Sequence, residues 1–195
     1  VLATKDVAAA KLRRVPHLRC RTREQCAIIS LRDRCARATH DFFGQRHFKY
    51  IHTPIFTKSD CEGAGEMFEV KDGFFKTPTF LTVSGQLEVE GFASGVGDSY
   101  TFGPTFRAEH SDTNRHLAEF WMIEPEMIGT FDEVVDVAEQ YIQYCILECI
   151  EKCGPEMEFL GVDAETLGHM VSKPFTRVKY EDAVKHLDIE WGTDL

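Results

Sequence analysis

The segment GPTFRAEHSDTNRHLAEFWMIEPEM, residues 103–127, alternates charged side chains with aromatic and small ones. Arg107 and Arg115 stand on either side of a polar run, and Phe120 follows shortly after it. A planar guanidinium can bridge a phosphate and a carboxylate through paired hydrogen bonds, and an aromatic ring can stack under a base. These residue types suit a nucleotide and an amino acid bound side by side. A hairpin with ordinary surface ion pairs would show the same spacing, so spacing alone favours neither interpretation.

Strand periodicity predicts that these side chains share one surface. In YTFGPTFRAE, Arg107 and Glu109 point to the same face as Gly103, whereas the alternate residues form an apolar face. In the return segment LAEFWMIEPEM, the same rule groups Phe120 with Glu124. If the two strands pair with these faces together, one surface of the sheet carries Arg107, Glu109, Phe120 and Glu124.

Two long helices are expected to support this sheet. Apolar residues recur at helical spacing from Glu24 to Phe43, with Thr22 as the N-cap. A second amphipathic pattern runs from Phe131 to Cys153 and ends at a Gly-Pro pair.

The region between the helices has strand and loop character. FKYIHTPIFT alternates like a strand, but Pro54 interrupts it, which confines this part to a sheet edge or an interface. SDCEGAGEMF is a Gly-rich loop, and FFKTPTFLTVSGQLEVEGFA combines strand and helix-start character.

Composition and charge narrow the class of protein. The chain has 195 residues, 43% of them hydrophobic, which is enough for a globular core, and no window is apolar enough for a membrane span or signal peptide. The net charge of -10 does not suit a general nucleic-acid surface. The basic stretch KLRRVPHLRCRTREQ could contact an anionic partner or could be a solvated linker.

Seven cysteines are scattered along the chain. Reduced thiols are expected, because a chain of this length does not need disulfides to fold. Cys145, Cys149 and Cys153 fall four apart on one helix face, and we expect them to be small buried hydrophobic residues and not metal ligands.

The motif FRAE followed by RHLAEFWMIEPE resembles the second signature motif of class II aminoacyl-tRNA synthetases, and the whole 103–127 segment is similar to the asparagine branch of that family. SDCEGAGEMF, PTFLTVSGQLEVE, WGTDL and RDRCARATHDFFGQRHFKYIHTPI, the last in the place of the first motif, resemble the same branch. The resemblance extends from about residue 19 to residue 195.

The resemblance implies an α+β fold with an antiparallel sheet flanked by helices, truncated at its C-terminal side. Residues 1–20 would be a connector from an anticodon-binding domain, and residues 21–195 a partial catalytic domain, with motif 1 at about 31–56 and motif 2 at about 101–127. Nothing in the sequence resembles the family's third motif. We therefore expect this polypeptide alone to be inactive, and normal turnover in ATP–pyrophosphate exchange would refute that.

The family's nucleotide-binding roles fall on five positions of motif 2. Arg107 falls where an arginine binds the α-phosphate of ATP and the substrate carboxylate, and it is the expected catalytic residue. Arg115 and His116 fall where the family contacts the outer phosphates, and Phe120 falls where a ring stacks on adenine. Glu109 would contact either the adenine amino group or the asparagine amide, and the sequence leaves both roles open.

The amino-acid-binding roles fall on residues before and after motif 2. Glu62 lies in a loop that closes over the amino acid, and Ser84, Gln86 and Glu124 fall where the related aspartate enzymes hold the substrate ammonium group. Those enzymes have a lysine where this chain has Val89, and the charge of that lysine pairs with the substrate carboxylate. This chain has no cation at that position to pair with a charged substrate side chain. Asparagine is therefore favoured over aspartate.

The implied reaction activates asparagine with ATP and Mg²⁺ and transfers it to tRNA(Asn), in a homodimer that packs through the motif 1 region around Pro54. The expected location is cytoplasmic, with an organellar one left open. Two alternatives remain: an asparagine synthetase on the same fold, against which Val89 counts, and a non-catalytic interaction module.

Overall fold

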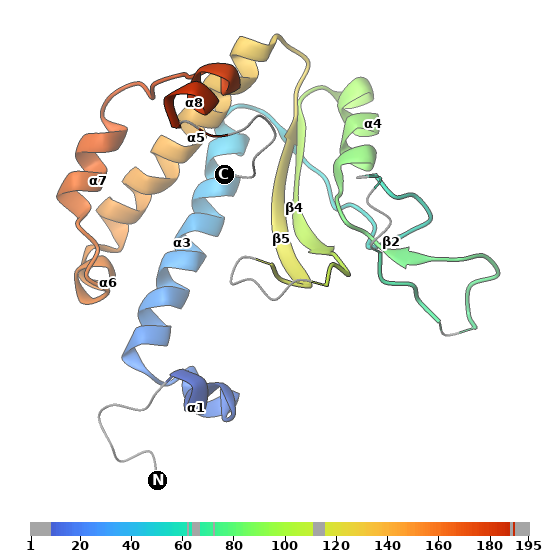
Figure 1. The fold of residues 1–195 in the computed structure, drawn as a ribbon, viewed down its shortest axis with the longest axis horizontal. Helices are drawn as coiled ribbons and strands as arrows, with labels where there is room; N and C mark the ends of the chain where they lie inside the picture. Colours follow the sequence, from blue (N-terminus) through green and yellow to red (C-terminus); the bar gives the residue numbers. More distant parts are fainter. Residues whose placement is uncertain are drawn as a thin grey trace. The chain divides into compact units, whose positions relative to one another are not determined.

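The computed structural model describes residues 9–61, 63, 67–71, 73–110, 116–187 and 189. Its helices and strands, in chain order, are α1 (Ala9–Arg13), α2 (Pro16–Arg19), α3 (Arg23–Gln45), β1 (Lys49–Tyr50), β2 (Phe56–Thr57), β3 (Phe80–Leu81), α4 (Gln86–Val96), β4 (Ser99–Phe106), β5 (Glu119–Glu126), α5 (Phe131–Lys152), α6 (Gly154–Phe159), α7 (Ala164–Val171) and α8 (Tyr180–Leu187) (Figure 1). The α+β composition matches the expectation from the sequence. None of the helices in this described part of the chain combines the length and the apolar character that crossing a membrane requires.

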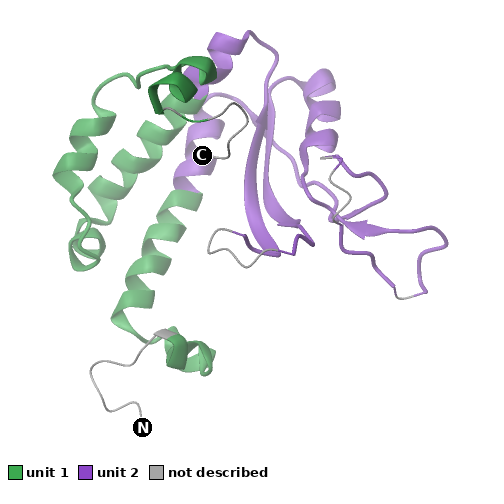
Figure 2. Cartoon of the chain, in the orientation of Figure 1, with its two compact units in different colours: residues 1–36, 138–195 green, residues 37–137 purple. Residues whose placement is uncertain are grey.

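The chain divides into two compact units. The helical unit consists of residues 1–36 and 138–195, and the sheet unit consists of residues 37–137 (Figure 2). Both long helices run from one unit into the other, since α3 enters the sheet unit at residue 37 and α5 leaves it after residue 137.

In the helical unit, α3 and α5 lie side by side. The guanidinium of Arg34 on α3 pairs with the carboxylate of Glu148 on α5 at 2.7 Å. The start of α3 is capped as predicted, because the backbone N–H of Gln25 donates to the hydroxyl of Thr22 at 3.3 Å. The predicted end of α5 is also confirmed, but the Gly-Pro pair that ends it opens a further short helix, α6.

The sheet unit is built on a three-stranded sheet of order β1-β4-β5. β4 and β5 form the expected antiparallel hairpin, in register from Ser99 opposite Glu126 to Phe106 opposite Glu119. β1 adds a parallel pair to β4, and β2 and β3 form a separate antiparallel ribbon. Pro54 lies in the break between β1 and β2, as its missing N–H requires.

One face of the sheet packs on the C-terminal end of α3. Phe42 and Phe43 are each 1% exposed, and the Phe43 ring stacks on Tyr100 of β4 with centroids 4.6 Å apart. His40 contacts the same face, with its Nδ1 2.9 Å from the Tyr100 hydroxyl and its ring 5.8 Å from that of Phe102. The apolar face predicted from the alternation of β4 is therefore the face that α3 covers.

The predicted strands are longer than the observed ones. β4 ends at Phe106 and not at Glu109, and β5 begins at Glu119 and not at Leu117. The pairing nevertheless continues one step beyond the strands, because the N–H of Arg107 donates to the carbonyl of Ala118 at 3.1 Å. The alternation of side chains therefore extends to Arg107.

Candidate active site

The floor of the candidate site is the face of the hairpin that α3 does not cover. Thr101 lies opposite Glu124, Gly103 opposite Met122, and Thr105 opposite Phe120, and directly opposed residues project from the same face. A side chain added at Gly103 would have only the Thr101 hydroxyl oxygen within 4 Å, at 3.8 Å. The sheet therefore offers open space above this glycine, as the small residues of the segment predicted.

Arg107 and Phe120 come together at one end of this floor. The guanidinium carbon of Arg107 lies 5.5 Å from the centroid of the Phe120 ring, within cation–π range. Both residues are half-buried. The pairing of β4 with β5 thus brings the predicted phosphate-binding and base-stacking groups to one surface.

Glu109 and His116 meet where the two strands lead into the connecting segment. The Nε2 atom of His116 lies 3.6 Å from Oε2 of Glu109, so a protonated imidazole would form an ion pair with the carboxylate. Two other predicted site residues, Glu62 and Arg115, lie outside the described residues.

A hydrogen-bond network joins the other three predicted residues. The hydroxyl of Ser84 donates to Oε1 of Glu124, and the N–H of Gly85 donates to Oε2 at 3.0 Å. The N–H of Gln86 donates to the Ser84 oxygen at 3.0 Å. Ser84 and Glu124 are buried, whereas the Gln86 side chain is exposed at the start of α4 and donates to Glu90 at 2.8 Å. Glu124 therefore holds the turn that presents Gln86.

Gly85 is a residue of this site that sequence reasoning missed. A Cβ at this position would lie 2.7 Å from Oγ1 of Thr53 and 2.9 Å from Cγ2 of Thr101. The two threonine hydroxyls are themselves 3.3 Å apart. The turn before α4 can approach the sheet this closely only because residue 85 has no side chain. The sequence signal was a glycine between two predicted site residues, Ser84 and Gln86.

Negative charge concentrates beside the network. Burial raises the pKa of Glu126 above its ordinary value, and the neighbouring carboxylates of Glu90 and Glu124 raise it further. This end of the floor therefore favours positively charged groups, such as an ammonium or a metal cation, whereas Arg107 favours anions at the other end.

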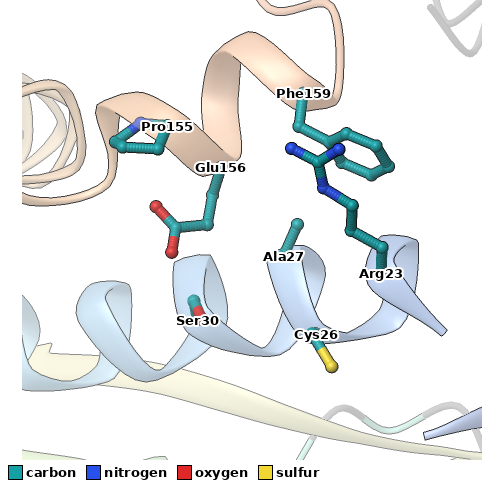
Figure 3. A pocket seen from close by; sticks show the side chains of 7 residues that line it. All are labelled: Arg23, Cys26, Ala27, Ser30, Pro155, Glu156 and Phe159. Carbon is teal, nitrogen blue, oxygen red and sulfur yellow. The ribbon is translucent and has the colours of Figure 1, made fainter. Parts of the chain in front are cut away.

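A pocket of about 180 Å³ lies elsewhere, between α3 and α6 in the helical unit (Figure 3). The guanidinium of Arg23 lies over the Phe159 ring at 4.1 Å, and Ser30 and Glu156 also line the pocket. None of the residues predicted for the site lines it. The residues that line this pocket belong to the helical unit, whereas the candidate site lies on the β4–β5 hairpin of the sheet unit.

Comparison with known proteins identifies the family of this chain. A family model described as tRNA synthetases class II (D, K and N) matches residues 9–194. The chain belongs to this family.

Within the family, the chain is similar to asparagine--tRNA ligases. It is 42% identical to that of Rhodopirellula baltica, over 95% of this chain and 44% of the relative. It is 46% identical to that of Desulfotalea psychrophila, over 94% of this chain and 45% of the relative. The chain thus spans less than half the length of these curated relatives.

A solved structure gives the same result for the fold. The asparaginyl-tRNA synthetase from Pyrococcus horikoshii, complexed with asparaginyl-adenylate, superimposes with a TM-score of 0.89 at 28% identity, over 96% of this chain and 44% of that chain. The expected class II catalytic fold is confirmed.

Proposed function

We propose that this chain forms part of an asparagine--tRNA ligase, in which the β4–β5 face binds ATP and asparagine for adenylate formation. The observation that carries the proposal is the position of Arg107 over Phe120, on the same face as the Ser84–Glu124 network. The similarity to asparagine--tRNA ligases over 94% or more of the chain supports it.

In the proposed first step, the asparagine carboxylate attacks the α-phosphate of ATP and pyrophosphate leaves. Arg107 would bridge the α-phosphate and the carboxylate, because a guanidinium presents paired donors to both anions and stabilises the charge that develops between them. Phe120 would stack on adenine, which orients the nucleotide. His116 and Arg115 would contact the outer phosphates, and Glu109 would accept a hydrogen bond from the adenine amino group or the asparagine amide.

The amino acid would lie at the acidic end of the floor. Gln86 and Glu124 would hold its ammonium group, with Ser84 keeping the Glu124 carboxylate in place, and Glu62 would close over it. Val89 is fully buried on α4, and no cation occupies its position. An uncharged amide therefore suits this site better than a carboxylate, which would be left unpaired on burial.

Mg²⁺ would enter with the nucleotide, because it keeps most of its water and is usually held by phosphate oxygens and one or two carboxylates. Burial is the main cause of the raised pKa of Glu126, and the carboxylates of Glu90 and Glu124 that raise it further would attract a cation bound nearby. When bound, the ion would neutralise phosphate charge during the transfer.

In the second step, the terminal hydroxyl of tRNA(Asn) would take the asparaginyl group from the adenylate. The enzyme would act as a homodimer that packs through the motif 1 region. Pro54 is exposed there, beside Ile55 and Phe56, which are 39% and 54% exposed. Light scattering at increasing protein concentration would measure this association.

The test of the proposed function is ATP–pyrophosphate exchange by the natural gene product that carries this sequence. We expect exchange to depend on asparagine, with a kcat/KM for aspartate lower by roughly 10⁴-fold, as hydrogen-bonding sites achieve without editing. Exchange that depends equally on aspartate, or that is absent with both amino acids, would contradict the proposal.

A further inference from the structure

Two thiols meet where α3 and α5 pack together in the helical unit. The Sγ atoms of Cys35 and Cys149, which are 114 positions apart in the chain, lie 3.4 Å from each other. Neither cysteine forms a disulfide in this structure. A disulfide has an S–S bond of about 2.05 Å, so these sulfurs need to approach by only about 1.4 Å to be joined.

The surrounding contacts keep this pair in place. The residues immediately before the two cysteines, Arg34 and Glu148, form the 2.7 Å ion pair between the same helices. Their side chains are only 20% and 18% exposed, so water screens the pair less than it would on an open surface. The ion pair therefore fixes the register of α3 against α5 at the turn that carries the thiols.

The two thiols differ in environment. Cys35 is exposed, whereas Cys149 is 8% exposed. Burial, contact with Cys35 and the neighbouring thiols of Cys153 and Cys145 raise the pKa of Cys149 to about 12. The buried thiol therefore stays protonated near neutral pH, and the exposed thiol is the one that a dissolved oxidant meets first.

We propose that Cys35 and Cys149 form a reversible disulfide that links α3 to α5 when the protein meets a peroxide. Cys35 attacks one oxygen of hydrogen peroxide, the O–O bond breaks, and the products are a sulfenic acid on Cys35 and one water. The Cys149 sulfur then attacks the Cys35 sulfur, the S–O bond breaks, and a second water leaves with the Cys149 proton. Two thiols lose two electrons, and one peroxide gains them.

The cysteines around this pair are not arranged as metal ligands. Within the described residues, no three or more His, Cys, Asp or Glu side chains are arranged to hold a metal ion. Cys145 and Cys153 are one helical turn away from Cys149 on either side, and the sulfur of Cys149 contacts that of Cys35 on α3. Oxidation of one defined pair is therefore the chemistry that this geometry supports.

The test treats the purified chain with hydrogen peroxide, blocks the remaining thiols with an alkylating reagent and digests the product without reduction. We expect a Cys35–Cys149 linked peptide as the major oxidised species. Its mass should be lower by two hydrogens than the summed masses of the two reduced peptides. Dithiothreitol should reverse it. Faster migration on a non-reducing gel should accompany the link, because a closed loop compacts the denatured chain.

The matched variants are Cys35→Ser and Cys20→Ser, both at exposed positions where folding should persist. Cys35→Ser should abolish the fast-migrating species, and Cys20→Ser should leave its amount unchanged. Linkage of Cys35 to Cys145 or Cys153 instead, or oxidation of Cys35 to the sulfinic acid without any link, would overturn the proposal. Because the readout is a covalent product, it does not depend on the proposed enzymatic function.

Discussion

The Ser84 hydroxyl donates a hydrogen bond to the Glu124 carboxylate, which lies 40 positions further along the chain. The same carboxylate accepts the N–H of Gly85 at 3.0 Å. These two bonds attach the turn before α4 to β5, and Gln86 is the first residue of the helix that follows. The geometry of the proposed amino-acid end of the site thus depends on a carboxylate that is itself largely buried.

Ser84→Ala should destabilise the protein. It removes one of the two donors to Glu124 and leaves a buried carboxylate oxygen unsatisfied, which costs about 1–3 kcal/mol. Urea denaturation measures the loss. The control is Ser94→Ala on α4, where the exposed hydroxyl donates only to the carbonyl of Gly91, and a change within about 0.5 kcal/mol is expected. Equal urea midpoints for the two variants would show that the hydrogen bond from Ser84 to Glu124 contributes nothing to the stability of the folded state.

Gly85→Ala and Gly91→Ala should have opposite effects. A methyl group at residue 85 meets the side chains of Thr53 and Thr101 at under 3 Å, so the turn must shift at a cost of about 1–3 kcal/mol. At residue 91, inside α4, nothing lies within 4 Å, and alanine should gain about 0.5–1 kcal/mol from its better helix propensity. Thermal unfolding of both variants checks the pair. A stabilising Gly85→Ala would mean that the threonines move aside freely.

Arg107→Lys tests the proposed bridge between the two reactants. Lysine keeps the charge but loses the planar fork, so kcat/KM for pyrophosphate exchange by the natural gene product should fall by about 10²-fold or more. The matched control is Arg177→Lys in the helical unit, where the guanidinium pairs with Glu139 at 3.3 Å and the side chain is 46% exposed. That variant should keep its activity. Retained activity in Arg107→Lys would leave the assignment without support.

Glu126 should make the folded state less stable as the pH rises. Its pKa is raised on folding, by burial first and then by Glu90 and Glu124, so the folded state binds the proton more tightly than the unfolded state does. Stability is then lost between the ordinary pKa of 4.5 and the raised one. Glu126→Gln should be more stable than the unmodified protein at neutral pH, and this advantage should disappear at more acidic pH.

Urea midpoints between about pH 4 and pH 8 measure this difference. The control is Glu119→Gln, which removes a charge at an exposed position on the same strand and leaves Glu126 in place. A constant offset between Glu126→Gln and the unmodified protein across the whole range would contradict the assignment of the raised pKa.

Local patterns in the sequence predicted the elements that carry the site. Helical spacing and the Thr22 cap located α3, and the alternation of residues 100–109 predicted which face of β4 packs on α3. The same alternation overestimated both strands, because a periodic pattern does not reveal where pairing ends. The helices after residue 153 were not predicted.

The sequence by itself determined which side chains share a face, since the two-residue period of a strand and the 3.6-residue period of a helix are local properties. Only the tertiary structure decided the contacts between distant segments. The donors to Glu124, the close approach of Gly85 to Thr53 and the contact of Cys35 with Cys149 each join residues at least 32 positions apart. Such contacts depend on how whole elements pack, and no local periodicity encodes that packing.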